Sequence, residues 1–117
     1  MSEHQIQCNI IELAKLHEHI YPELKWLHAI PNGGNRNIVT AMKLKKEGVK
    51  RGVFDLFLPV PNKKYHGYYL EIKYSKNKLT GNQNEFKKFV ESQGYKTGVF
   101  YDHSVAIDSL FDYLKDV

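Results

Sequence analysis

Alternation of apolar and polar residues predicts a strand over residues 67–73. Leu70 and Ile72 point to one face of this strand, whereas Glu71 and Lys73 point to the other. The apolar segment 53–58 contains a single carboxylate, Asp55, and its burial in a strand is costly unless a cation compensates the charge. The pattern therefore predicts an acid and a base on one surface, with a second acid in a neighbouring strand.

The segment between these strands predicts how the two acids meet. Residues 59–66 contain two prolines and several polar residues, which is typical of a loop joining two antiparallel strands. Asp55 and Glu71 then become cross-strand neighbours. Two converging carboxylates suit Mg²⁺ or Mn²⁺, which are hard cations that accept one or two protein carboxylates together with water or phosphate. Lys73 beside them is suited to polarise an attacking water or to stabilise the charge on a reacting phosphate.

Helical patterns flank the two strands. A capping box over residues 2–5 predicts a first helix that ends near Pro22, and Asn35 to Glu47 predicts a second that stops at Gly48. The apolar stripe of the first helix consists of Ile6, Ile10, Leu13 and Ile20.

A second capping box, over residues 80–83, predicts a helix that buries Phe86, Phe89 and Val90 and ends at Gly94. Further strands are predicted over 26–30 and 96–101, with a turn at 31–34 after the former. Ser104 is the expected cap of a last helix, which offers Val105 and Leu110 for packing. This order of elements predicts an α/β fold, a mixed sheet flanked by helices.

Length and composition indicate one domain over residues 1–117. The 117 residues are 42% hydrophobic and 26% charged, which supports a modest single core. The longest apolar runs are about six residues, far from the roughly 20 that span a bilayer, so we expect no membrane association and a cytoplasmic location. Cys8 is the only cysteine, which excludes an internal disulfide and favours a reducing compartment.

Positive charge is concentrated around the two acids. The net charge is only +4, but cations cluster on both sides of the predicted strands. Those before Asp55 are Arg36, Lys43, Lys45, Lys46, Lys50 and Arg51, and those after Glu71 are Lys73, Lys76, Lys78, Lys87 and Lys88. This distribution favours a polyanionic partner, bound with release of counterions. The alternative is a solvated basic surface, which is common on helices.

Other chemistries lack their signatures. His17 and His19 are two residues apart and would not face the same way on a helix, and no Cys or His pair has zinc-finger spacing. A serine nucleophile elbow is also absent.

Taken together, these motifs resemble the VRR-NUC branch of the PD-(D/E)XK nuclease superfamily. The resemblance runs from Glu3 to about Tyr101. It rests on G-V-K-R-G-V-F-D-L at 48–56, L-E-I-K at 70–73, L-T-G-N-Q at 79–83 and Gly94-Tyr95. One departure is Phe54, where the family often has proline.

The resemblance implies a restriction-endonuclease-like αβββαβ core and hydrolysis of phosphodiester bonds in DNA with Mg²⁺ or Mn²⁺. It implies that Asp55, Glu71 and the Ile72 carbonyl hold the metal, and that Lys73 and Gln83 belong to the catalytic site. An acidic residue of the first helix often completes such a site. Glu3 is the candidate, Glu12 is the fallback, and a favourable carboxylate in the first helical turn is the simpler reading of Glu3. Gln83 likewise has a simpler reading, as part of the capping box.

Small members of this branch resemble structure-selective endonucleases that resolve four-way (Holliday) junctions as homodimers. We expect phosphate contacts from Arg36, Lys43, Lys46, Lys50, Arg51, Lys76 and Lys78. Aromatic residues suited to a dimer interface are Tyr65, Tyr68 and Tyr69, or Phe111 and Tyr113 of the last helix. The alternative function is a non-catalytic nucleic-acid-binding module that retains the nuclease fold.

Overall fold

The computed structural model describes residues 1–31 and 37–117. The elements in chain order are α1 (Glu3–Leu16), the 3-10 helix η1 (Pro22–Trp26), β1 (His28–Ala29), α2 (Ile38–Lys46), β2 (Leu56–Leu58), β3 (Tyr68–Ile72), α3 (Gly81–Ser92), β4 (Lys96–Phe100) and α4 (His103–Leu114). Arg36 and most of the predicted turn at 31–34 lie outside the described residues. Within the described residues, no helix combines the length and the apolar character that crossing a membrane requires.

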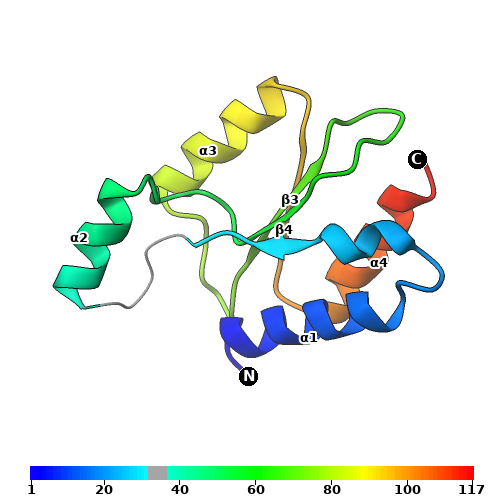
Figure 1. The fold of residues 1–117 in the computed structure, drawn as a ribbon, viewed down its shortest axis with the longest axis horizontal. Helices are drawn as coiled ribbons and strands as arrows, with labels where there is room; N and C mark the ends of the chain where they lie inside the picture. Colours follow the sequence, from blue (N-terminus) through cyan, green and yellow to red (C-terminus); the bar gives the residue numbers. More distant parts are fainter. Residues whose placement is uncertain (32–36) are drawn as a thin grey trace.

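The four strands form one mixed sheet in the order β1-β2-β3-β4. The first three strands pair antiparallel, and β4 lies parallel to β3, which puts β3 at the centre of the fold (Figure 1). Leu70 of β3 pairs with Leu56 on one side and with Gly98 on the other. The predicted α/β class and the αβββαβ order, with α2 inserted after β1, are thereby confirmed.

The main core lies on one face of the sheet. Leu70 and Ile72 of β3 pack there with Ile6 and Ile10 of α1 and with Leu110 of α4. Because side chains alternate along a strand, the other face of β3 presents Tyr69, Glu71 and Lys73. Helix α3 lies over this second face, where Phe86 contacts both Tyr69 and the buried Phe54. The sheet thus separates an apolar layer from a layer that carries the polar candidates.

Several predicted helix ends are corrected by the structure. Helix α1 has the predicted capping box but ends at Leu16, where His17 caps its last turn, and Pro22 starts η1 instead. Ile20 is consequently exposed and lies outside the apolar stripe. The cap of α4 is Asp102, whose Oδ1 accepts a hydrogen bond from the Ser104 amide at 2.7 Å. Asp102 is the residue directly before the first helical residue, and a side chain at this position can accept a hydrogen bond from the free amides of the first turn.

Two side chains that were expected to pack are exposed instead. Phe89 of α3 and Val105 of α4 both point to solvent. Only one stripe of each helix faces the sheet, and these residues lie outside it.

Two of the aromatic residues proposed for a dimer interface belong to the core. Tyr68 and Tyr113 are buried, and their rings pack 5.1 Å apart. The Tyr68 hydroxyl lies 2.5 Å from Ser109 Oγ, and the Tyr113 hydroxyl donates to the Val60 carbonyl at 2.6 Å. Phe111 stacks on Tyr21, at the margin of the same core. Neither Tyr68 nor Tyr113 is therefore available to a partner at the surface.

Helix α2 differs from the other helices in burying none of its residues. Asn37 caps it by accepting a hydrogen bond from the Thr40 amide at 2.8 Å, and Gly48 follows its last turn, as predicted. In Figure 1 the helix stands at one end of the molecule, beside the start of α3 and away from the layers that cover the sheet.

Gly52 connects the segment after α2 to α3. Its φ is +91°, and a Cβ atom at this position would lie 2.6 Å from the main-chain oxygen of Asn82. Only a residue without a side chain permits this approach. The close contact holds the segment that leads to Asp55 against the first turn of α3.

We expect Gly52→Ala to destabilise the protein more than Gly48→Ala. Gly48 also has positive φ, +102°, but its Cβ would meet nothing within 4 Å, so its substitution costs only the backbone strain of about 1–2 kcal/mol. Gly81→Ala, with neither strain nor a close neighbour, is the control and should be nearly neutral. Urea denaturation of the three variants measures the differences. Equal losses for Gly52→Ala and Gly48→Ala would contradict a tight contact with Asn82.

Candidate active site

Asp55 closes the end of the β2–β3 pairing with its side chain. It directly precedes β2, and its main-chain oxygen accepts a hydrogen bond from the Ile30 amide at 2.8 Å. One residue beyond the Leu56–Leu70 pair, it stands opposite Glu71, and its Oδ2 accepts from the Ile72 amide at 2.9 Å. The backbone of Asp55 is therefore fixed by Ile30, and its half-buried carboxylate is fixed by the Ile72 amide.

Glu71 is the most unusual side chain of the sheet, because it is a carboxylate that is only 2% exposed. Its Oε2 accepts a hydrogen bond from Gln83 Nε2 at 3.0 Å and lies 3.7 Å from Lys73 Nζ. Its Oε1 is buried and has no hydrogen-bond partner among the described residues. A buried carboxylate oxygen without a partner is costly, so this atom marks a position suited to a ligand.

The surroundings of Glu71 favour its protonated form. Burial is the main cause that raises its pKa from 4.5 to about 8, and the negative charge of Asp55 adds to the increase. The ammonium of the buried Lys73 acts in the opposite direction without cancelling these effects. The cluster thus contains two carboxyl groups and one ammonium group, so one ammonium cannot neutralise both acids when they are ionised.

Gln83 has both of the roles that the sequence left open. Its Oε1 accepts a hydrogen bond from the Thr80 amide at 2.9 Å, which completes the capping box of α3. Its Nε2 meanwhile donates to Glu71. The helix start is therefore tied directly to the acid.

Glu3 and Glu12 are separated by the turns of α1. Glu3 is in the first turn, and its charge is among those that raise the pKa of Glu71, so its carboxylate lies on the side of the cluster. Glu12 instead lines a surface hollow with Asn9 and His103. Of the two acids, only Glu3 contributes to the raised pKa of Glu71.

The donor atoms at this cluster fit a hard divalent cation. Asp55 and Glu71 supply carboxylate oxygens, and the Ile72 carbonyl faces the same side as the Ile72 amide that binds Asp55. In the described part of the chain, no group of three or more His, Cys, Asp or Glu side chains is placed to hold a metal. Two carboxylates and a main-chain oxygen, completed by water, are sufficient for Mg²⁺ or Mn²⁺, and the unpartnered Glu71 Oε1 is the atom that such an ion would satisfy.

Six of the seven cations predicted to contact phosphate are described, and all six are exposed. Lys43 and Lys46 lie on α2, Lys50 and Arg51 follow it, and the remaining two, Lys76 and Lys78, lie between β3 and α3. None of these six forms an ion pair within the described residues. The second group flanks Asn77, whose carbonyl accepts a hydrogen bond from the Tyr101 hydroxyl at 2.6 Å, so this segment is held in place.

Fold and site together define a nuclease-type α/β domain, with an acid pair and a lysine on one face of a mixed sheet. The family model for the VRR-NUC domain matches residues 1–103, and the chain therefore belongs to the VRR-NUC domain family. Membership implies a nucleic acid as the substrate. A solved structure titled "VRR_NUC domain protein" superposes with a TM-score of 0.79 at 24% identity, over 100% of this chain and 91% of that one, and shows the same fold. No curated protein matches the chain.

Sequence reasoning missed two features around the site. The first is the contact of Gly52 with Asn82, for which the only signal was a glycine close before Asp55. The second is the exposure of Ile38, Val39 and Met42 on α2. Their apolar character was visible in the sequence, but a local pattern does not show that no other element covers a helix.

The raised pKa of Glu71 predicts how stability depends on pH. Because the folded-state pKa, about 8, is above the ordinary value of 4.5, the folded state binds the proton more tightly than the unfolded state. The metal-free protein should therefore lose stability as pH rises from 4.5 to about 8. Glu71→Gln, which does not titrate, should have the higher Tm above this range, by about 4 °C or more, the shift that roughly 1 kcal/mol produces in a small domain.

Thermal melts in chelator at several pH values test this expectation. Glu85→Gln, at an exposed position of α3, is the matched control and should follow the wild type. Parallel Tm curves for wild type and Glu71→Gln would show that Glu71 does not hold a proton in the folded protein.

Proposed function

We propose that this protein is a metal-dependent endonuclease that hydrolyses phosphodiester bonds in branched DNA. The observation that carries the proposal is the buried Glu71, held between Asp55 and Lys73 with one oxygen unpartnered. A protein gains nothing in stability from such an acid, so a role in binding and chemistry accounts for it best. Membership of the VRR-NUC family supports the same reaction class.

Each residue of the cluster has a distinct task in this proposal. Asp55, Glu71 and the Ile72 carbonyl hold Mg²⁺ or Mn²⁺, and Glu3 is the candidate for a further carboxylate ligand. When bound, the cation lowers the pKa of a water molecule and neutralises charge on the scissile phosphate. Lys73, whose ammonium is buried and therefore held in place, orients the nucleophile and stabilises the developing negative charge. Gln83 positions Glu71 through its hydrogen bond.

The basic surface binds the DNA backbone. Phosphates on both sides of the cluster are contacted by Lys43, Lys46, Lys50, Arg51, Lys76 and Lys78. Arg36, which lies outside the described residues, is a further candidate for a phosphate contact. Lysine contacts to phosphate position the duplex without reading its sequence. Recognition therefore depends on the shape of the DNA, which agrees with a structure-selective enzyme.

A four-way junction is the substrate that we propose, and a homodimer is the working unit. One chain supplies one set of Asp55, Glu71 and Lys73, whereas resolution of a junction requires cuts in two opposed strands. A two-fold pair of chains matches the two-fold symmetry of the junction.

We expect sedimentation at micromolar concentration to give a dimer on junction DNA, and we expect the two nicks to be symmetric. A monomer under all conditions that still makes symmetric nicks would refute the dimer. A dimer that cuts only linear duplex would refute the choice of substrate.

Substitution of the cluster should abolish cleavage and leave binding intact. We expect Asp55→Asn, Glu71→Gln and Lys73→Ala each to reduce junction cleavage by about 100-fold or more, because each removes a group that acts in the transition state. Glu85→Gln, at an exposed position of α3, is the control. Cleavage at the wild-type rate by Glu71→Gln would refute the assignment.

Chelation extends the same assay. EDTA should abolish cleavage, Mg²⁺ or Mn²⁺ should restore it, and Ca²⁺ should support binding with poor turnover because its coordination is looser. Full activity in chelator would exclude the metal mechanism. Binding of DNA without cleavage even in the presence of Mg²⁺ or Mn²⁺ would identify a non-catalytic nucleic-acid-binding module instead.

A further inference from the structure

Helix α2 presents an apolar surface that the described residues leave uncovered. Ile38 is 77% exposed, Val39 is 78% exposed and Met42 is 57% exposed, and we call these three residues the α2 patch. Large aliphatic side chains clustered on one short helix are unusual at a surface without a partner. A nine-residue helix without a fully buried residue is also only marginally stable by itself, so contact with a ligand would stabilise it.

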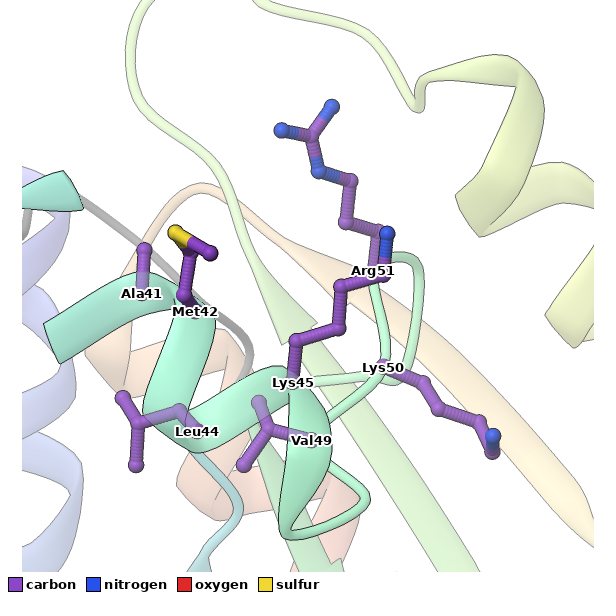
Figure 2. Close-up of a pocket in the computed structure, with 7 residues that line it drawn as sticks. All are labelled: Ala41, Met42, Leu44, Lys45, Val49, Lys50 and Arg51. Carbon is purple, nitrogen blue, oxygen red and sulfur yellow. The ribbon is translucent and has the colours of Figure 1, made fainter. Parts of the chain in front are cut away.

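A cavity of about 590 Å³ adjoins the α2 patch. Its apolar lining consists of Ala41, Met42, Leu44 and Val49, and its charged lining includes Lys45 and Arg51. Figure 2 shows that Lys45 and Arg51 extend on the same side as Met42, whereas Lys50 points the other way. An apolar wall with cations beside it suits a ligand that combines a flat apolar ring with an anion, as a nucleotide does.

The charge of this region selects between possible occupants. Residues 43–51 contain five cations and one acid, Glu47. Two copies of the helix would bring like charges together, which opposes a contact between two identical chains. The same charge attracts a polyanion. A nucleic acid is therefore the occupant that complements both the apolar and the cationic groups.

The position of α2 links the cavity to the candidate active site. Arg51 precedes Gly52, whose backbone packs against Asn82, and Asn82 precedes the Gln83 that binds Glu71. Figure 1 likewise shows the segment after α2 running to the start of α3. Because these contacts connect α2 to the acid cluster, one DNA molecule can supply both the nucleotide at α2 and the strand that is cut.

We propose that the α2 patch and its cavity bind an unstacked base of branched DNA, while Lys45 and Arg51 hold the adjacent phosphates. This inference rests on the proposed function and adds the means by which branched DNA is recognised. A base in continuous duplex must be unstacked at a cost of a few kcal/mol, whereas a base at a branch point is already partly free. A site for an unstacked base therefore prefers branched DNA without reading its sequence.

The test measures binding and base unstacking in EDTA, where cleavage does not interfere. The probes are a four-way junction with 2-aminopurine at the branch point and a linear duplex of the same sequence. Wild-type protein should increase the 2-aminopurine fluorescence of the junction. The double variant Ile38→Ser/Met42→Ser should lose this increase and should bind the junction about tenfold more weakly, since two aliphatic contacts are removed. Its affinity for the linear duplex should not change.

Matched variants separate the apolar contribution from charge and from folding. Val105→Ser, at a valine of α4 that is 57% exposed like Met42, should behave as wild type. Lys45→Ala should weaken binding to both DNAs and reduce the salt dependence, and the double serine variant should keep that dependence. Circular dichroism should show that all variants are folded, because every substituted side chain is exposed.

Three results would overturn the inference. The first is wild-type fluorescence and affinity in the double serine variant. The second is an equal loss of affinity for junction and linear duplex. The third is a protein that sediments as a dimer without DNA and becomes a monomer on Ile38→Ser/Met42→Ser, which would assign the patch to a second copy. A protein that unstacks the junction base through α2 but cuts no DNA would instead refute the proposed nuclease activity and leave this inference standing.

Discussion

Burial of the Glu71 carboxylate is the constraint on which the rest of the site depends. Taking a carboxylate out of water costs several kcal/mol unless charge or hydrogen bonds compensate, and here the compensation is partial. Gln83 and Lys73 serve one oxygen, the other has no partner among the described residues, and Asp55 adds a second negative charge. The protein meets this cost through a large apolar core on the opposite face of the same strand. The stability contributed by that core allows the Glu71 carboxylate to remain buried, although its burial by itself is unfavourable.

Each neighbour of Glu71 is held by an element whose own geometry is well determined. Asp55 is fixed by the Ile30 and Ile72 amides, so its orientation follows from the pairing of three strands. Lys73 continues the parallel pairing of β3 and β4, because its amide donates to the Phe100 carbonyl at 2.9 Å. Glu3 and Gln83 lie in the first turns of α1 and α3, each with a complete capping box. Strand pairing and helix capping therefore place all the groups before any ligand is bound.

The sequence predicted the centre of the fold well and the margins less well. The alternation of residues 70–73 placed Glu71 and Lys73 on one face, and the loop after Leu58 placed Asp55 opposite, because both inferences depend only on the period of a strand and on chain connectivity. The catalytic and metal-binding roles of these residues remain predictions. The family, the α/β class and the element order were also predicted from the sequence, and the structure and the comparisons confirm them.

What failed depends on which surfaces meet in three dimensions. Tyr68 and Tyr113 were assigned to an interface but are buried, since their hydroxyl groups find Ser109 and the Val60 carbonyl more than 40 residues away in the chain. The opposite error concerns α2, where Ile38, Val39 and Met42 are apolar but are left exposed by the described residues. The predicted start of α4 was wrong for a local reason. Asp102 caps the helix, but Ser104 is a side chain equally suited to capping, so the sequence did not distinguish them.

The double hydrogen bonding of Gln83 restricts which residues this position tolerates. For helix capping, glutamate serves as well as glutamine at the third position of the box. Here, however, the side chain must also donate a hydrogen bond to Glu71. A glutamate could not donate it when ionised and would bring another negative charge to about 3.0 Å from Glu71 Oε2. The requirement of the helix and the requirement of the acid therefore overlap in one amide. Functional relatives of this chain should keep glutamine where stability alone would allow either residue, so the choice at position 83 separates intact sites from chains that retain only the fold.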